Sequence, residues 1–453
     1  IVYMVYKIIK AQIQLPKQRR AFLNHLDKVM MEYKNKDFSA LSLEEVVAEY
    51  RRFEQSLLLE WKAPLVNDFF AMIWFGLLKS QCEKLMGKQS NIHNDLLCGS
   101  QDIISVEPLH ESLRISEKIY KNSVLRSLFE QNTPERILEL LKEEKYSEIK
   151  DEVFAYIDRF GDRCIGELKL ESISYTQSPE LYIKLLKNYV EQKIFTLHHD
   201  NNIENDIREK AEALVQAKLK GPIKKWWFNY TLNKARDMVS NRENLRYERT
   251  RAFGMVRKIF LAMGEKLQDA NVIENHRDVF YLKLEELLDL SVKSNTNQVK
   301  NLIIERKSEF AHYKDQENPS ERFFTYGNNF SDEYIYSSTK LENVHSELSG
   351  IGCCPGRVRA KVMVIDHPEN VGSLDGCILV TSSTDPGWVT LFPSASGILV
   401  ERGSLLSHSA IVSREMGIPC IVSIDGLLRS LKTGDEVIMD GQTGEIIKLH
   451  DGQ

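Results

Sequence analysis

One short segment combines a histidine with residues that suit phosphate chemistry. Residues 403–419 read GSLLSHSAIVSREMGIP, with His408 between two serines. A β-branched run at 397–400 precedes the segment, and Gly417 stands where a helix end favours glycine in the left-handed conformation. We therefore predict a strand over 397–400, a turn, and a helix that begins near His408 and stops at Gly417.

A histidine in the first turn of a helix is placed for phosphoryl chemistry. Free backbone N–H groups and the positive end of the helix dipole favour a bound anion there. An imidazole exposed on a turn can attack phosphorus as a nucleophile. We predict that His408 is exposed and carries a phosphoryl group, positioned by the backbone near Gly403 and by the hydroxyls of Ser407 and Ser409. The alternative is an exposed capping histidine without a catalytic role.

The amino-acid composition and the hydrophobic periodicity of the chain change near residue 350. Residues 1–314 are rich in Leu, Glu, Lys and Arg with helical periodicity, and Ser42 with Glu45 forms a capping-box pattern. Residues 315–350 are polar and rich in Asn and Ser, which is typical of a linker. Residues 351–453 are predicted to form a small α/β domain with strands near 360–365, 377–381, 397–400, 420–422, 436–439 and 445–447. The fold class is thus multidomain, a large mostly α-helical domain followed by a small α/β domain.

Composition excludes several classes of protein. The 453 residues carry 60 Lys and Arg against 65 Asp and Glu, a net charge of −5 without basic runs, which argues against a nucleic-acid binder. The most apolar stretch, residues 69–78, has about half of the roughly 20 residues that a membrane span needs. Seven scattered cysteines without a C-x-x-C pair indicate reduced thiols in a cytoplasmic protein and no metal site.

Residues 403–419 resemble the phosphohistidine swivelling domain of phosphoenolpyruvate-utilising enzymes. The family pattern is approximately G-G-x-x-(T/S)-H-(A/G/S)-A-(I/V)-(V/L)-(A/S)-R-E-x-G-I-P with the histidine phosphorylated, so the resemblance makes His408 the phosphocarrier. This sequence departs from it at Ser404, where a second glycine is usual. Upstream, the run Asp385-Pro386-Gly387-Trp388 is most similar to the rifampicin phosphotransferase branch. Asp385 there is also a predicted N-cap.

The order of domains in that branch is an ATP-grasp domain, a helical acceptor domain and the histidine domain. Residues 1–314 resemble the acceptor domain through residues 61–68, 93–97, 159–167, 242–246 and 278–286. Phosphoenolpyruvate synthases and pyruvate phosphate dikinases carry a further barrel that binds pyruvate, and we expect no such barrel in this protein because the sequence ends directly after the histidine domain. The resemblance implies an ATP-grasp domain in a longer chain or a separate subunit, and it places ATP and Mg²⁺ on that domain.

The resemblance also implies a reaction. ATP phosphorylates the histidine, AMP and phosphate are released, and the swivelling domain carries the phosphoryl group to a small-molecule acceptor hydroxyl or enol. Phosphoryl transfer depends on positioning and charge neutralisation. The candidates for charge are Arg163, Arg242 and Arg246. Glu167 is the candidate for orienting or deprotonating the acceptor, and His93 for activating it.

Each candidate has a structural alternative. Arg163 and Glu167 have the spacing of an i,i+4 ion pair, and Arg242 and Arg246 lie in a highly charged stretch. The aromatic runs Trp226-Trp227-Phe228, Trp74-Phe75 and Phe69-Phe70 either line an apolar acceptor pocket or belong to the core. At the level of function, one alternative is a phosphoenolpyruvate synthase-like enzyme acting on a small carboxylic acid. Another is a non-catalytic phosphocarrier or binding subunit that serves a separate kinase.

Overall fold

A computed structural model provides the structure of the chain. It describes residues 2–87, 92–98, 104, 107–164, 166–195, 203–290, 295–314, 316, 323–324, 336–337, 348–365, 374–405 and 407–449. The predicted linker, residues 315–350, lies largely outside the described residues and stays a prediction. In the described part of the chain, no helix is long and apolar enough to cross a membrane.

The chain divides into two compact units. The first comprises residues 1–36, 50–258 and 348–453, and the second comprises residues 37–49 and 259–347. The candidate site lies within the first unit, and the second unit is the smaller of the two. It contains η3 (His276–Tyr281), α12 (Leu284–Asp289), α13 (Thr296–Lys314) and a two-stranded pairing of β1 (Phe323–Phe324) with β2 (Tyr336–Ser337).

Helices make up the N-terminal part of the first unit. They are α1 (Val2–Lys34), η1 (Leu58–Glu60), α3 (Lys62–Met86), α4 (Ile92–Asp95), α5 (Glu107–Lys121), α6 (Ser123–Gln131), α7 (Pro134–Leu140), η2 (Glu144–Tyr146), α8 (Ser147–Phe160), α9 (Pro179–Gln192) and α10 (Ile203–Lys218). Two further helices, α2 (Leu43–Ser56) and α11 (Pro222–Asp269), contribute residues to both units. The mostly helical character predicted for this part of the chain is confirmed.

Local signals in the sequence explain where several helices begin. The Ser42 N–H donates to Glu45 Oε2 at 2.7 Å and the Glu45 N–H donates to Ser42 Oγ at 3.3 Å, so the predicted capping box is present at the start of α2. Asn122 caps α6 through two backbone N–H groups, and Thr133 followed by Pro134 begins α7. These caps satisfy N–H groups that have no partner inside the helix.

The C-terminal part of the first unit is an eight-stranded sheet. Its strand order is β3-β10-β9-β5-β6-β7-β8-β4. The strands are β3 (Leu348–Ser349), β4 (Ile351–Cys354), β5 (Arg357–Val364), β6 (Ile378–Thr381), β7 (Gly397–Val400), β8 (Cys420–Val422), β9 (Glu436–Asp440) and β10 (Glu445–Lys448). The pairs from β5 to β8 are parallel and the others antiparallel. Strands β6, β7 and β8 are entirely buried, as expected for parallel strands covered on both faces.

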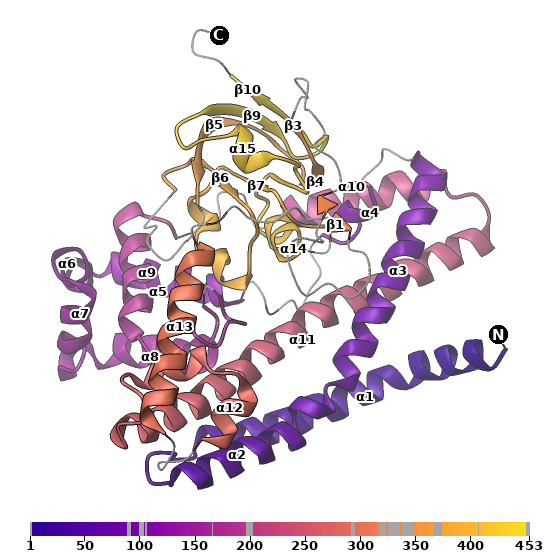
Figure 1. The fold of residues 1–453 in the computed structure, drawn as a ribbon. Helices are drawn as coiled ribbons and strands as arrows, with labels where there is room; N and C mark the ends of the chain where they lie inside the picture. Colours follow the sequence, from indigo (N-terminus) through magenta and orange to yellow (C-terminus); the bar gives the residue numbers. More distant parts are fainter. Residues whose placement is uncertain are drawn as a thin grey trace. The chain divides into compact units, whose positions relative to one another are not determined.

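Short helices connect the buried strands, and one of them carries the histidine motif. They are η6 (Pro386–Thr390), η7 (Phe392–Ser394), α14 (His408–Glu415) and α15 (Leu427–Ser430). Figure 1 shows α14 and α15 beside the orange and yellow strands, and α14 packs on β4 and β8. Strands β7 and β8 have the predicted bounds. The loop after β6 begins η6 with Asp385, whose side chain accepts the Gly387 N–H as predicted for an N-cap.

Candidate functional site

His408 is the first residue of α14. Ser407 precedes it with extended backbone, and the helix ends before Gly417, which has a left-handed φ of +65°. The predicted helix is confirmed, but the prediction that His408 is exposed is wrong. The side chain of His408 is only 5% exposed. The reason is a contact far away in the sequence, because the imidazole lies against α11.

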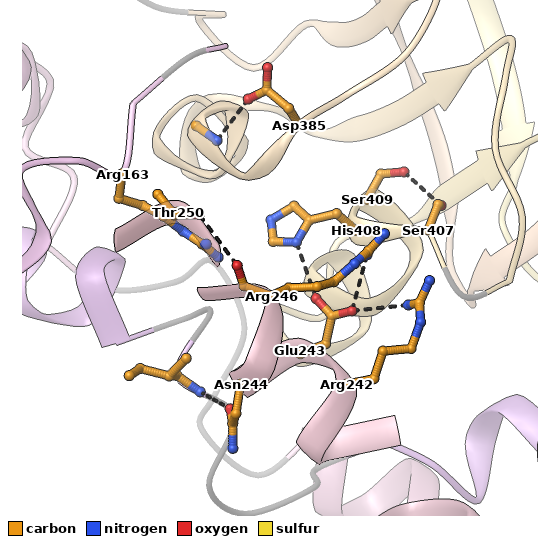
Figure 2. A network of polar contacts seen from close by, with 12 residues as sticks. Arg163, Arg242, Glu243, Asn244, Arg246, Thr250, Asp385, Ser407, His408 and Ser409 are labelled. Atoms are coloured by element: carbon orange, nitrogen blue, oxygen red, sulfur yellow. Dashed lines mark hydrogen bonds and ion pairs between the residues drawn. The ribbon is translucent and has the colours of Figure 1, made fainter. Parts of the chain in front are cut away.

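The partner of His408 on α11 is Glu243. Figure 2 shows His408 Nδ1 directed at Glu243 Oε2, at 3.5 Å, while Glu243 Oε1 is 3.2 Å from one guanidinium nitrogen each of Arg242 and Arg246. Glu243 is 1% exposed. Within the described part of the chain, His408 Nε2 is a buried nitrogen without a hydrogen-bond partner. One ring nitrogen is therefore engaged, and the other is left for chemistry.

The protonation states follow from the surroundings. Burial lowers the pKa of His408 below its usual value, and the hydrogen bond to Glu243 offsets only part of that effect. Burial alone would raise the pKa of Glu243, but His408, Arg246 and Arg242 lower it to about 2. At neutral pH the pair is thus a carboxylate and a neutral imidazole. The Nδ1 proton faces Glu243, and the lone pair of Nε2 is available.

A second buried carboxylate belongs to the loop after α8. Arg163 and Glu167 are 5% and 2% exposed, with Arg163 Nη1 at 3.4 Å from Glu167 Oε1. The Thr250 hydroxyl donates to the same oxygen at 2.6 Å. Burial raises the pKa of Glu167 to about 7, with Arg163 and Thr250 opposing the rise and Asp385 adding to it. The i,i+4 pair expected as an alternative is present, yet it lies in a loop and meets α11.

Three arginines follow one face of α11. Arg242, Arg246 and Arg249 are spaced by four and three residues, which brings side chains to one side of a helix. The positive charges of Arg163 and Arg246 both act on His408, lowering its pKa. Asp68 on α3 lies 3.8 Å from Arg242. Around the imidazole the site thus gathers Glu243, Arg163 and Arg246, and Glu167 joins it through its contact with Arg163. Such a cluster of cations can neutralise a phosphoryl group in transfer.

Not every predicted site residue belongs to this cluster. Ser407 and Ser409 flank His408, with their hydroxyl oxygens 3.1 Å apart. Gly403 lies in the turn before α14, where an added Cβ would meet Val422 at 3.1 Å. His93 is elsewhere, buried on α4 with its ring edge-to-face against Phe75 at 5.6 Å between centroids.

Some of the aromatic candidates belong to the core, and the acceptor pocket stays a prediction. Phe228, Phe70 and Trp74 are buried in one hydrophobic core. Trp226 and Trp227 are exposed and stack on Tyr230. In the described ranges, no group of three or more His, Cys, Asp or Glu side chains is placed to hold a metal ion.

Sequence reasoning missed Glu243, Arg249 and Thr250 as site residues. A signal existed for two of them. Glu243 is the acidic residue between two predicted cationic candidates, and Arg249 continues their spacing by one helical turn. Nothing in the sequence indicated that Thr250 would reach Glu167, because the contact joins a helix to a loop 83 residues away.

Two protein families match parts of this chain. Residues 373–444 match the mobile domain of phosphoenolpyruvate-utilising enzymes, and residues 62–243 match the fourth domain of rifampicin phosphotransferase. The first match contains α14 with His408, and the second reaches Glu243 on α11. Residues 373–444 are thus similar to the mobile domain of the phosphoenolpyruvate-utilising enzymes, and residues 62–243 are similar to a domain of rifampicin phosphotransferase.

Individual relatives agree with these matches. The chain is 28% identical over 315 residues to a rifampicin phosphotransferase of Bacillus cereus, an alignment of 68% of this chain and 35% of that protein. A rifampicin phosphotransferase of Streptomyces sviceus is 27% identical over 320 residues, with the same coverage of 68% and 35%. The prodigiosin synthesizing transferase PigC of Serratia marcescens is 25% identical over 427 residues, 91% of this chain and 46% of that protein. The chain spans about a third to a half of the length of these relatives.

Proposed function

We propose that this chain is the acceptor-binding and phosphohistidine part of a phosphotransferase. Nε2 of His408 carries a phosphoryl group and delivers it to a hydroxyl or enol of a small molecule bound by the helical part. The observation that carries this proposal is the state of the imidazole. Its Nδ1 faces the Glu243 carboxylate, its Nε2 has no hydrogen-bond partner in the part of the chain that the structure describes, and burial lowers its pKa, which favours the neutral form.

The transfer step assigns a task to each group. An acceptor oxygen attacks phosphorus, the bond from phosphorus to Nε2 breaks, and the electron pair of that bond returns to the imidazole. Arg163 and Arg246 face the charge on the phosphoryl oxygens. Glu167, with a pKa raised to about 7, takes the proton that the acceptor hydroxyl loses. Glu243 keeps the Nδ1 proton in place throughout.

The phosphoryl donor in this proposal is ATP. An ATP-grasp domain, in the same longer chain or in a separate subunit, binds ATP and Mg²⁺ and phosphorylates His408 with release of AMP and phosphate. The relatives support this, since they are two to three times longer than the aligned segment. A rigid phosphocarrier alone would not need its histidine inserted among arginines of the helical part, which favours an enzyme over a carrier subunit.

The test follows the phosphoryl group. The full-length natural protein is incubated with ATP labelled at the β-phosphate, and the peptide that contains His408 is isolated. We expect acid-labile, base-stable label on that peptide, with AMP released, and no label in His408→Asn. His25→Asn, a change at an exposed histidine, serves as the matched control and keeps the label. A folded protein that takes no label from ATP would contradict the ATP-dependent mechanism.

A further inference from the structure

Asp385 uses its two carboxylate oxygens for two different partners. Oδ1 accepts the Gly387 N–H at 2.9 Å and caps η6 within the C-terminal part of the chain. Oδ2 accepts the Gly166 N–H at 2.8 Å, across 219 residues of sequence. The cap alone explains one oxygen, and the second contact calls for a further role.

The loop that Asp385 holds is the one that supplies Arg163 and Glu167. Gly166 lies between these residues with a left-handed φ of +68°, and an added Cβ would come within 2.5 Å of the Ser172 hydroxyl. The loop therefore depends on glycine to adopt this conformation. The hydrogen bond to the Gly166 N–H therefore holds the backbone between Arg163 and Glu167. This backbone sets the positions of the Arg163 guanidinium and the Glu167 carboxylate.

Neighbouring contacts attach the same turn to the helical part. The Tyr189 hydroxyl on α9 donates to the Thr390 carbonyl at 2.6 Å. Trp388 is buried in a core that also contains Leu109 and Leu113 of α5. The region of η6 is thus a docking surface, and among these contacts Asp385 is the one that carries charge and reaches the site loop.

We propose that Asp385 is a positioning residue, which couples docking of the C-terminal part to assembly of the acceptor side around His408. When the turn before η6 docks, the Asp385 carboxylate binds the Gly166 N–H and holds the loop with Arg163 and Glu167 in place. The inference rests on the proposed function of His408 as phosphocarrier. It adds that the domain carrying the phosphoryl group also completes the site that receives it.

The charge of Asp385 strengthens the coupling. Its carboxylate acts on Glu167 and raises the pKa of that group further, in addition to burial. On the same loop, Arg163 and Lys169 are the cations that act on Asp385. Docking consequently brings an anion toward Glu167 and raises the proton affinity of the carboxylate that is proposed to take the proton of the acceptor.

The experiment uses this chain with two substitutions. Asp385→Asn retains one oxygen, which can still cap η6. The other oxygen is replaced by an uncharged NH2 group, which cannot accept the Gly166 N–H. Asp385→Ser retains a capping hydroxyl but is too short to reach the loop. Asp440→Asn, at a carboxylate that caps the hairpin turn through Gln442 and Thr443, is the matched control. Circular dichroism verifies the fold, and the serine variant keeps the test open if the asparagine variant does not fold.

Two quantities are measured, one rate and one protecting concentration. The first is acylation of His408 by diethyl pyrocarbonate, which reports how often the buried imidazole is uncovered. The second is the concentration of inorganic phosphate that protects His408 from this reagent, which reports how well Arg163 and its neighbours are held. For both Asp385 variants we expect about tenfold faster acylation and about tenfold weaker protection, the loss of one hydrogen bond to a charged group. Asp440→Asn should match the wild type.

The outcomes separate this inference from the proposed function. Unchanged acylation and protection in the Asp385 variants would overturn the inference. Faster acylation with unchanged protection would also overturn it, because Asp385 would then attach the domain without positioning the loop. Phosphoramidate, a chemical phosphoryl donor, is the independent check on His408. If wild-type His408 reacts with diethyl pyrocarbonate but accepts no phosphoryl group from phosphoramidate, the proposed function fails whatever the Asp385 variants show.

Discussion

Two buried glutamates of the candidate site have pKa values that are shifted in opposite directions. Glu243 on α11 is 1% exposed and its pKa is lowered to about 2, whereas Glu167 in the loop after α8 is 2% exposed and its pKa is raised to about 7. Burial is the same for both, so burial does not decide the difference. Glu243 faces two arginines and the His408 imidazole, while Glu167 has one arginine at 3.4 Å and the anionic Asp385 nearby.

The difference shows that two carboxyl groups of one site can suit different steps of a reaction. A carboxylate that is ionised at every physiological pH can hold a proton on Nδ1 and stabilise positive charge on the ring. A carboxyl group with a pKa near 7 can take up or release a proton during the reaction. Pairs of titratable groups whose surroundings separate their pKa values are typical of acid–base sites. The comparison therefore gives Glu243 and Glu167 different roles, and four variants test it.

Replacing the imidazole should have the largest effect. In His408→Asn we expect loss of phosphoryl transfer by at least about a thousandfold, because the nucleophile is gone. Since His408 is buried, the free energy of unfolding should also fall, by about 1–3 kcal/mol. Labelling of the His408 peptide and urea unfolding measure the two effects. A variant that keeps its label at another residue would remove His408 from the comparison altogether.

Removing the charge of the ionised glutamate should come next. Glu243→Gln leaves Arg242, Arg246 and the Nδ1 proton without their carboxylate, so we expect about a hundredfold slower phosphorylation of His408 and about 3 kcal/mol less stability. Glu212→Gln, at a glutamate paired with Arg236 at 2.7 Å, is the control and should lose about 1 kcal/mol or less. Equal behaviour of the two variants would show that Glu243 has no special role.

The two glutamates should give opposite pH dependences of stability. The pKa of Glu167 is above its ordinary value of 4.5, so the folded state binds more protons than the unfolded state, and the free energy of unfolding falls as pH rises from 4.5 to about 7. The pKa of Glu243 is below 4.5, so its contribution is present above that pH and is lost as pH falls toward 2. These two changes are the neutral limb, between pH 4.5 and about 7, and the acid limb, below pH 4.5. Each changes the free energy of unfolding by about 3 kcal/mol.

Glu167→Gln should therefore remove the loss of stability between pH 4.5 and about 7 and leave the acid limb in place, whereas Glu243→Gln should do the reverse. Urea unfolding at a series of pH values measures both. A Glu167→Gln variant with the pH profile of the wild type would mean that Glu167 is already ionised in the folded protein, and the comparison between the two carboxylates would not hold.

The smallest effect is expected at Thr250. Its hydroxyl donates to Glu167 and favours the ionised form, so Thr250→Val should raise the pKa of Glu167 and move the neutral limb to higher pH by less than about one unit. The free energy of unfolding should fall by about 1 kcal/mol. Thr231→Val changes a buried threonine that is bonded to the Trp227 carbonyl on the same helix and should leave the limb where it is. An unmoved limb in Thr250→Val would show that the hydroxyl does not control Glu167.

Much of the fold was predictable because its signals are local. The helical periodicity of the N-terminal part, the capping box at Ser42 and Glu45, and the strands at 397–400 and 420–422 depend on residues a few positions apart. The same holds for α14, which begins at His408 and ends before Gly417 as predicted. The burial of His408 was not predictable, because the residue that covers it lies 165 positions earlier in the chain.

The sequence by itself singled out His408 as the proposed phosphocarrier and predicted the helix that presents it. A motif of 17 residues with its own turn, helix and glycine stop is specified by neighbours along the chain. Only the tertiary structure decided the state of that histidine and the roles of its carboxylates. Proton affinity in a buried site depends on which charges are brought within a few ångströms, and those charges come from α11, the loop after α8 and the turn before η6.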